Sequence, residues 1–340
     1  MSISLDELRN GLDLDKDLVF PEKPSHPEMR ESTSIWMFDE TGAFGFPRMG
    51  VEAEAASWDN RLFQANFAFA DGRILNGAGR GAPPSPLGPD GRPTVLGAGA
   101  IRFQCIEPFR RWSMLFDGPA IDGHVSQQIA RTLDPNRRTH VRLEAEMIMQ
   151  TPAWIQATDE KNATLEDNLM GLGYRFEHLF RAEGIFHVDG KARPFKGTGL
   201  RIHRQSIRRL EGFYGHCWQS ALFPDGSAFG FITYPPKPDG TETYNEGYLY
   251  RNGRMWKAKA AKAPWLRRIV PAGDDVSLEL ESELGRTRIE GRTTLSTFRV
   301  GNPDIGGLNL QQSGVLYRWD DQTAYGMIER SSHESLTTLG

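Results

Sequence analysis

The sequence predicts a mainly β protein built from antiparallel strands, in the barrel or sandwich class. Three observations support this prediction. Apolar and polar residues alternate in many short runs, such as RLFQANFAF and HVRLEAEMIM. Most runs end at Asp-Gly, Asn-Gly or a single Gly, which are typical of hairpin turns. No long segment with the 3.6-residue apolar period of a helix competes with these strands.

Residues 1–33 are expected to form a short helix followed by a loop, outside the β-domains. Asp6 and Glu7 suit the first turn of a helix, where acidic side chains interact favourably with the helix dipole. The prolines after residue 20 interrupt any further regular helix.

Residues 34–172 are predicted to form a first β-domain. The alternating run RLFQANFAF leads directly into Asp71-Gly72, which is a hairpin signal. A loop rich in proline and glycine, GAPPSPLGPDGRPTV, separates this hairpin from the next strands. The polar stretch 151–173 marks the expected end of the domain.

Residues 173–340 are predicted to form a second β-domain of similar construction. A faint internal repeat supports this division. Tyr174-Arg175-Phe176 is followed by an alanine and a glycine, and Tyr317-Arg318-Trp319 is followed by the same two residue types at nearly the same spacing. An offset of about half the chain is typical of a duplicated domain.

Composition excludes several classes of partner. The 340 residues carry a net charge of −4, so there is no polybasic surface for nucleic acid. No window reaches the roughly 18–20 apolar residues of a membrane span, and the N-terminus lacks the pattern of a secretory signal. Cys105 and Cys217 lie in apolar runs and are interpreted as small buried residues. We therefore expect a soluble, cytoplasmic protein; its oligomeric state is left open.

Motifs for cofactor chemistry are missing from the sequence. It has no Gly-x-Gly-x-x-Gly that opens a helix, no Walker lysine and no Gly-x-Ser-x-Gly nucleophile elbow. Its histidines show no His-x-His or His-Glu-x-x-His spacing for a metal. We predict no cofactor and no metal, which leaves cofactor-free chemistry or plain binding.

Ionisable residues gather in one segment, GTGLRIHRQSIRRLEGFYGHCWQS. Period-2 alternation puts Arg201 and His203 on one face of a strand, and His216 and Trp218 on one face of another. These groups either belong to a solvated outer face or point into a cavity. For a single strand histidine, a structural hydrogen-bonding role is the commoner outcome.

The same region resembles a known family. YRFEHLFRAEGIFHVDGKARPFKGTGLRIHRQSIRR followed by HCWQSALFPDG is similar to the start of the second domain in the AttH/carotenoid 1,2-hydratase superfamily, and YGMIERS resembles its last strand. Glu177, Arg201, His203 and Arg208 fall on positions of the family motif. Ile202 stands where the family has the aspartate that is its plausible proton donor, so that role is not transferred.

The resemblance implies two tandem lipocalin-like β-barrels. It also implies cofactor-free activities, since the superfamily includes hydratases that protonate an alkene and fungal Diels–Alderases that shape a polyene for cyclisation. We therefore predict a cofactor-independent lyase, hydratase or isomerase acting on a small hydrophobic terpenoid, steroid or aromatic metabolite. The substrate would bind inside a barrel or between the two.

Four residues are the catalytic candidates. His203 is assigned as general acid/base and Arg201 as the group that fixes a developing anion, with Glu177 orienting them; His216 is the further acid/base candidate. The first three are predicted to converge on one void. The expected substrate-binding residues are Trp218, Phe213, Tyr214, His178, Arg208 and Trp112. The alternatives are a non-catalytic carrier of an apolar molecule and an interaction module with a filled interior.

Overall fold

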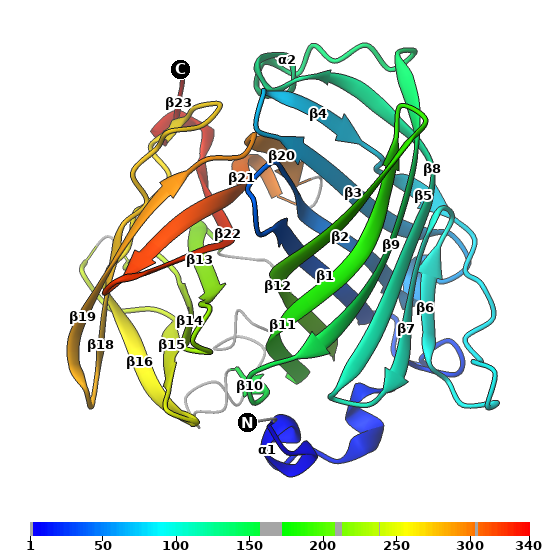
Figure 1. The fold of residues 1–340 in the computed structure, drawn as a ribbon, viewed down its shortest axis with the longest axis horizontal. Helices are drawn as coiled ribbons and strands as arrows, with labels where there is room; N and C mark the ends of the chain where they lie inside the picture. The colour runs from blue at the N-terminus through cyan, green and yellow to red at the C-terminus, as the bar shows by residue number, and fades with distance from the viewer. Residues whose placement is uncertain (1–2, 157–171, 208–212, 238, 303–304) are drawn as a thin grey trace.

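The computed structural model describes residues 3–156, 172–207, 213–237, 239–302 and 305–340. Within these residues, two antiparallel sheets each close into an eight-stranded barrel, and the two barrels lie against each other (Figure 1). The predicted fold class, two tandem β-barrels with a short N-terminal helical segment, is confirmed.

In the described part of the chain, eight strands close the first barrel in the order β1-β2-β3-β4-β8-β9-β11-β12. Their bounds are β1 (Met29–Asp39), β2 (Phe44–Glu54), β3 (Arg61–Phe69), β4 (Arg73–Asn76), β8 (Arg111–His124), β9 (Arg138–Met149), β11 (Leu172–Val188) and β12 (Lys191–Ile207). Shorter strands extend this sheet: β5 (Gly79–Gly81), β6 (Val95–Ala98), β7 (Ile101–Glu107) and β10 (Trp154–Ile155). Among the described residues, the helices on this side of the molecule are α1 (Leu5–Arg9), the 3-10 turns η1 (Leu14–Asp17) and η2 (Ala55–Ser57), and α2 (Val125–Ala130).

The second barrel closes in the same way, with eight strands from the described residues in the order β13-β14-β15-β16-β18-β19-β21-β22. Their bounds are β13 (Gly215–Leu222), β14 (Ala228–Thr233), β15 (Asn245–Arg251), β16 (Arg254–Lys262), β18 (Leu278–Ser282), β19 (Gly285–Thr293), β21 (Ile305–Trp319) and β22 (Gln322–His333). The short strand β20 (Phe298–Asn302) pairs with β21. A two-stranded parallel pair, β17 (Arg268–Ile269) with β23 (Thr338–Leu339), and the turn η4 (Glu334–Leu336) lie near the C-terminus.

The boundary between the barrels differs from the expected one at residues 172 and 173. The hairpin of β11 and β12 pairs with β9 on one side and β1 on the other, so it completes the first barrel, and the second begins at β13. The Tyr-Arg-aromatic repeat explains the difference. It falls on β11 and β21, which hold the same place, next to last, in the two barrels. The repeat therefore marks equivalent strands and not the start of a domain.

Hairpin turns and cysteines follow the sequence interpretation. β11 and β12 are joined by Asp189 and Gly190, both with positive φ, as a two-residue turn of this kind requires. Gly72 also has a positive φ, at the turn between β3 and β4. Cys105 and Cys217 are both free and buried, as predicted. No helix among the described residues is long and apolar enough to cross a membrane.

Strands at the contact between the barrels are buried on both faces. Nine consecutive residues of β1, from 31 to 39, are buried, and so is all of β13. One face of each strand lines the interior of its own barrel, and the other packs against the opposite barrel. The apolar core accordingly has three parts, one inside each barrel and one between them.

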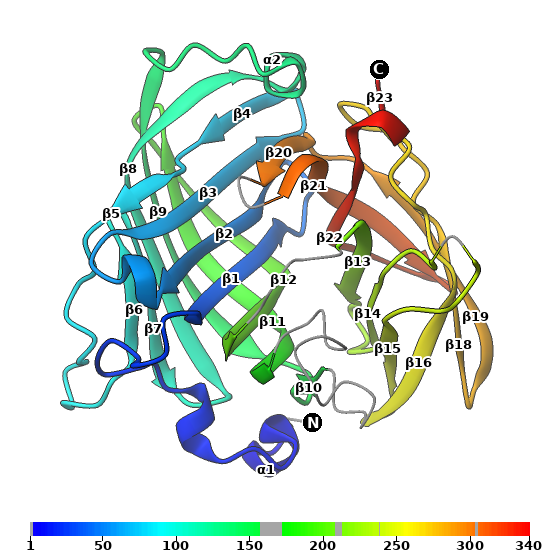
Figure 2. The ribbon, with the colours of Figure 1, turned by 180° about the vertical axis from the view of Figure 1, so that it is seen from behind.

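The N-terminal segment closes one mouth of the first barrel, where α1 and η1 lie below the strand ends (Figure 2). Asp17, at the end of η1, is fully buried there and binds three groups. Arg201 donates to Asp17 Oδ1 at 2.7 Å, while the backbone N–H of Phe109 and the indole N–H of Trp112 donate to Oδ2 at 2.5 and 2.8 Å. Burial alone would raise the pKa of Asp17, but the Arg201 charge and the His203 contact hold this pKa well below its usual range.

Replacing Asp17 by asparagine should destabilise the protein strongly, because the change leaves the Arg201 guanidinium buried without its counter-charge. Breaking one partner of a buried ion pair costs about 3–5 kcal/mol of unfolding free energy. Urea unfolding followed by tryptophan fluorescence measures the loss. In the wild type this stabilisation is present above about pH 4 and is lost as the pH falls, because the pKa is lowered in the folded state.

The matched control is Asp15→Asn, two residues away in η1. The Asp15 side chain is 65% exposed and pairs with Lys16 at 3.4 Å, so solvent screens the interaction and stability should change little. Equal, small effects of both substitutions would show that the N-terminal segment does not stabilise the first barrel.

Candidate functional site

A cavity of about 260 Å³ lies between the two barrels. It is lined from the first barrel by outward-facing residues of β1, β2 and β12, and from the second by residues of β13, β21 and β22. Its apolar lining includes Trp36, Ile202, Phe213, Trp218 and Tyr234. Charged and polar side chains also line it, among them Arg48, His216 and Glu329, so the cavity suits a molecule with both apolar and polar parts.

His216 lies on the wall of this cavity with two partners from β22. Its backbone N–H donates to Ser331 Oγ at 3.1 Å, and its ring Nδ1 lies 2.6 Å from the same oxygen. The ionised carboxylate of Glu329 can only accept a hydrogen bond, so the ring nitrogen that faces it carries the proton, and the Ser331 hydroxyl donates to the other nitrogen, Nδ1. That arrangement places the ring proton on Nε2, which lies 3.4 Å from Glu329 Oε1.

Strand register brings these residues together. In the pairing of β13 with β22, His216 is opposite Ser331 and Trp218 is opposite Glu329. Opposed residues of an antiparallel pair point to the same face, so all four side chains face the first barrel. Period 2 along β13 is what puts both His216 and Trp218 on this face, as the sequence predicts.

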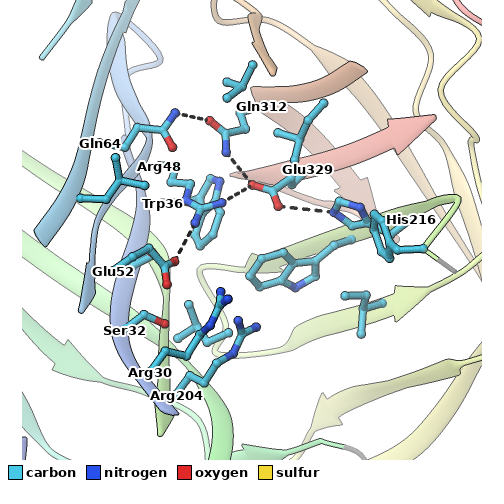
Figure 3. A pocket seen from close by; sticks show the side chains of 18 of the residues that line it. Arg30, Ser32, Trp36, Arg48, Glu52, Gln64, Arg204, His216, Gln312 and Glu329 are labelled. Carbon is cyan, nitrogen blue, oxygen red and sulfur yellow. Dashed lines mark hydrogen bonds and ion pairs between the residues drawn. The ribbon is translucent and has the colours of Figure 1, made fainter. Parts of the chain in front are cut away.

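Glu329 is held in its charged form. Its Oε2 lies 3.3 Å from the Arg48 guanidinium and accepts a hydrogen bond from Gln312 at 2.7 Å (Figure 3). Burial favours the neutral acid, but the Arg48 charge and the hydrogen bonds from His216 and Gln312 lower the pKa of Glu329 to about 2. The carboxylate therefore stays negative beside His216 at neutral pH and stabilises a protonated imidazole.

Arg48 joins the two barrels at this point. It comes from a bulge in β2, between Gly45 and Met49, and pairs with Glu52 of its own strand at 3.1 Å as well as with Glu329 of the second barrel. Its φ is 74°, a region that costs a non-glycine residue about 1–3 kcal/mol. The two ion pairs and the packing over Trp36, 5.6 Å from the ring centre, hold the residue in that conformation.

Glu177 lies behind the cavity wall. Its carboxylate accepts hydrogen bonds from Trp218 Nε1 at 3.2 Å and from Gln156 Nε2 at 2.5 Å, and lies 3.4 Å from Arg175. Burial raises the pKa of Glu177 to about 7, against the opposing effect of Arg175. The group is a buried acid that exchanges its proton near neutral pH, linked to the cavity through Trp218.

His203, Arg201 and Glu177 do not converge on one void, contrary to the prediction. Glu177 is opposite Ile202 in the pairing of β11 with β12, so it shares the outward face of Ile202, whereas Arg201 and His203 point into the first barrel. There His203 lies 3.6 Å from Asp17 Oδ1 and 3.5 Å from Glu31 Oε1.

Trp112 and His178 also lie inside the first barrel. The Arg201 guanidinium stacks 3.7 Å over the Trp112 ring, and the His178 ring N–H donates to the Leu8 carbonyl oxygen at 3.1 Å. Burial lowers the pKa of His178 to about 4, so this ring is neutral. Together with Asp17 these residues fasten the N-terminal segment to the barrel.

The remaining predicted residues are distributed as follows. Trp218 and Phe213 line the inter-barrel cavity, as their assignment to the pocket wall requires. Tyr214 is 78% exposed and is not part of the cavity lining. Arg208 lies outside the described residues.

Several cavity residues escaped the sequence interpretation. Arg48, Glu329, Arg30 and Arg204 come from four different strands, so no single motif contains all four. Glu329 lies within YGMIERS, which was matched only as a terminal strand. Glu329 and Ser331 are two residues apart, so they lie on one face of β22. That spacing was the one sequence signal that could have placed Glu329 beside His216, because β22 pairs with β13.

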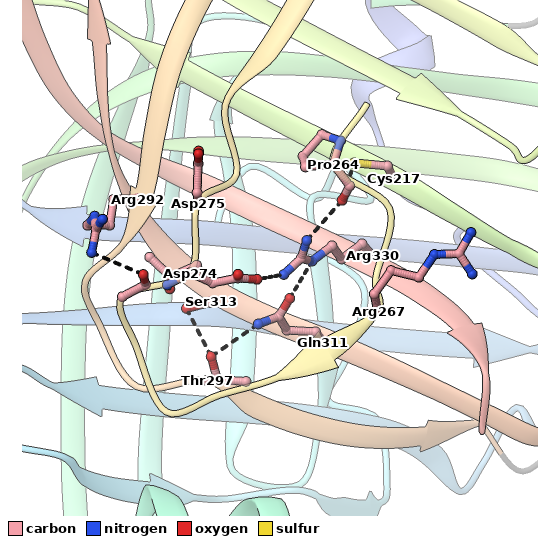
Figure 4. Close-up of polar contacts among 12 residues, drawn as sticks. Cys217, Pro264, Arg267, Asp274, Asp275, Arg292, Thr297, Gln311, Ser313 and Arg330 are labelled. Atoms are coloured by element: carbon pink, nitrogen blue, oxygen red, sulfur yellow. Dashed lines mark hydrogen bonds and ion pairs between the residues drawn. The ribbon is translucent and has the colours of Figure 1, made fainter. Parts of the chain in front are cut away.

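The interior of the second barrel holds its own polar cluster, drawn in Figure 4. Arg330, which alternates with Glu329, points inward. Its Nε donates to Gln311 at 2.6 Å, one terminal nitrogen donates to the Pro264 carbonyl at 2.9 Å, and the other pairs with Asp274. Every guanidinium nitrogen has a partner, so this cluster stabilises the barrel and offers no open binding group.

No group of three or more His, Cys, Asp or Glu side chains within the described ranges is arranged to hold a metal ion.

A family model described as a domain of unknown function, DUF7064, matches residues 17–334. The chain belongs to the DUF7064 family. The match begins at Asp17, the buried anchor of the N-terminal segment, and spans both barrels. A search of curated proteins finds no match for this DUF7064 protein.

Solved structures share the fold at low sequence identity. A Nitrosomonas europaea protein described as an AttH superposes with a TM-score of 0.58 at 14% identity, over 93% of this chain and 99% of its own. Kievitone hydratase from Nectria haematococca superposes with a TM-score of 0.55 at 11% sequence identity. The match covers 97% of this chain and 95% of the hydratase. CghA, solved with Sch210972, superposes with a TM-score of 0.54 at 12% sequence identity. The match covers 94% of this chain and 97% of CghA. The AttH-like tandem lipocalin-like fold that the sequence resemblance implies is confirmed.

Glu177 should make the stability of the wild type fall as the pH rises. Its pKa is about 7 in the folded protein and about 4.5 when unfolded, so the folded state is fully favoured below pH 4.5 and loses stability up to and through pH 7. Relative to Glu177→Gln, the wild type should lose on the order of 3 kcal/mol of unfolding free energy between pH 4.5 and pH 8. Urea unfolding at a series of pH values gives this difference.

Glu144→Gln is the control, because that side chain is 52% exposed on β9. It should reproduce the pH dependence of the wild type. A Glu177→Gln curve parallel to that of the wild type would mean that Glu177 is already ionised at low pH.

Proposed function

We propose that this DUF7064 protein is a cofactor-independent enzyme of the lyase, hydratase or isomerase type, which binds a small hydrophobic molecule between its barrels. The observation that carries the proposal is His216, an acid/base group on the wall of a partly aromatic cavity between the barrels, held in place by Ser331 and Glu329. One structural neighbour is a kievitone hydratase, which supports a reaction of this kind on this fold.

His216 acts as the general acid and base. The anionic Glu329 stabilises the imidazolium, which donates a proton to an unsaturated carbon of the substrate. Addition of water to the resulting cation, or loss of a different proton, returns one proton to His216. The first outcome is hydration and the second is isomerisation, and neither changes the oxidation state of the protein.

The cavity supplies the positioning. Trp36 and Trp218 meet edge to face at 4.7 Å between ring centres, and Phe213 lies 5.2 Å from Tyr234. Such walls hold an apolar molecule in one orientation beside His216. A site of this kind favours the enzyme over the carrier, because a carrier has no need of an acid/base pair on the wall of its cavity.

The first experiment identifies the molecule that native protein retains, by solvent extraction and mass spectrometry. Turnover of that molecule is then compared for the wild type and His216→Gln. Removal of a general acid/base group should lower kcat by about 10²–10⁴-fold and leave the affinity within about tenfold. Glu329→Gln should also lower kcat, since it removes the charge that stabilises the imidazolium.

His140→Gln is the matched control, because His140 is 69% exposed on β9, a strand that does not line the cavity. It should leave kcat unchanged. Retention of kcat within about tenfold in His216→Gln contradicts the catalytic role, and equal losses of kcat and affinity indicate a carrier instead.

A further inference from the structure

The outward faces of β1 and β2 build one side of the inter-barrel cavity. Ser32, Ser34 and Trp36 alternate along β1, and Glu52 of β2 lies directly opposite Ser32. Opposed residues of an antiparallel pair point to the same face, so these four side chains form one surface, which we call the β1–β2 wall. Figure 3 shows Ser32 below the Glu52 carboxylate at the edge of the cavity.

Short residues leave space at the middle of the β1–β2 wall. Ser34 lies opposite Gly50, and a Cβ atom at residue 50 would be only 2.2 Å from Ser34 Oγ. Any larger residue would collide with this hydroxyl, so the glycine leaves space beside it. Ser32 and Ser34 place two hydroxyl groups, each able to donate and to accept, between Glu52 and Trp36 on the lining.

The Glu52 carboxylate is engaged at one oxygen and not at the other. Oε1 accepts a hydrogen bond from Arg48 at 3.1 Å, whereas Oε2 is buried and has no donor within the described ranges. A buried acceptor without a donor costs about 1–3 kcal/mol, and a charged one costs more. A ligand that donates a hydrogen bond to Oε2 would remove this cost.

The other end of the β1–β2 wall presents the opposite need. Trp36 is 1% exposed, and its indole N–H finds no acceptor in the described part of the chain. A hydroxyl group can both donate to a carboxylate and accept from an N–H, whereas an ammonium group can only donate. Arg48 already supplies a counter-charge for Glu52, so the carboxylate needs a donor and not a further cation.

We infer that the substrate of this site is an apolar molecule bearing a hydroxyl group, which donates a hydrogen bond to Glu52 Oε2. The inference rests on the proposed function and specifies its substrate class. Arg48 contacts Glu52 at 3.1 Å and Glu329 at 3.3 Å, so a single guanidinium separates the hydroxyl position from the carboxylate beside His216. One small molecule can therefore bind Glu52 by its hydroxyl group and extend over Trp36 toward His216.

The test compares two probes of nearly one shape, 7-hydroxycoumarin and 7-fluorocoumarin, of which only the first can donate a hydrogen bond. Isothermal titration calorimetry on the full chain at pH 6.0, where the hydroxyl group is protonated, gives both affinities. The hydroxyl probe should bind at least about tenfold more tightly, because the fluorine leaves Glu52 Oε2 without a donor.

Glu52→Gln should reduce this preference to about threefold or less. Arg48 can only donate, so it holds the oxygen of the new amide, and the amide NH₂ replaces the acceptor Oε2. Glu54→Gln is the matched control and should keep the preference. Glu54 lies two residues along β2, also lines the cavity, and pairs with Arg30 at 3.3 Å.

Equal affinity of the wild type for the two probes, or binding of neither, overturns the inference whether or not the variants fold. A preference that survives in Glu52→Gln, or that is lost equally in Glu54→Gln, overturns it as well. His216→Gln separates this inference from the proposed function, because it should keep the preference while losing turnover. A missing preference with His216-dependent turnover contradicts the hydroxyl site alone, and a preference without such turnover indicates a carrier of hydroxylated molecules.

Discussion

The structure depends on strands that serve two packing surfaces at once. β1 and β12 of the first barrel, and β13 and β22 of the second, each present one face to their own barrel and the other to the neighbouring barrel. Because side chains alternate, adjacent residues on these strands carry out different tasks. Arg201 anchors the N-terminal segment while Ile202 lines the cavity, and Arg330 fills the second barrel while Glu329 faces His216.

Alternation explains how a small interface holds several ionisable groups in different states. Glu329 and Glu177 are both buried between the barrels, yet the pKa of the first is lowered to about 2 and that of the second is raised to about 7. Arg48 approaches Glu329 closely, together with hydrogen-bond donors, whereas burial dominates at Glu177. Two carboxyl groups of the same chemistry thus become a permanent anion and an exchangeable acid, the kind of division on which acid/base sites depend.

Much of the fold could be predicted from the sequence, because barrel strands leave local signals. Alternation and the Asp-Gly turns describe neighbours along the chain, and both appear in the structure. The half-chain repeat falls on equivalent strands of the two barrels. The barrel to which a strand belongs is decided by pairing with strands far away in the sequence. The sequence analysis therefore assigned the β11–β12 hairpin to the second domain, although it closes the first barrel. The grouping of His216 with Trp218 also followed from alternation alone.

The residues of the site were harder to predict from the sequence, because their grouping also depends on long-range strand pairing. His203 and Glu177 belong to one family-like motif, but a motif does not say which face of the sheet each residue takes once β11 and β12 have paired. Arg48 reaches the cavity through a bulge at a positive φ, a conformation that nothing in its neighbourhood predicts. Asp17, 184 residues before Arg201, lies in a segment that the sequence showed only as helix and loop.

The buried cluster inside the first barrel and the cavity outside it are connected through β12. Asp17 and Glu31 fix the inward side chains Arg201 and His203, which sets the position of the strand within the barrel. The outward side chains of that strand, Ile202 and Arg204, are thereby set on the cavity wall. A slip of one residue would exchange the two faces and place an isoleucine against Asp17 and a histidine in the cavity. The ion pair at the mouth of the barrel therefore determines which side chains the second barrel meets, although none of its own atoms lies at the site.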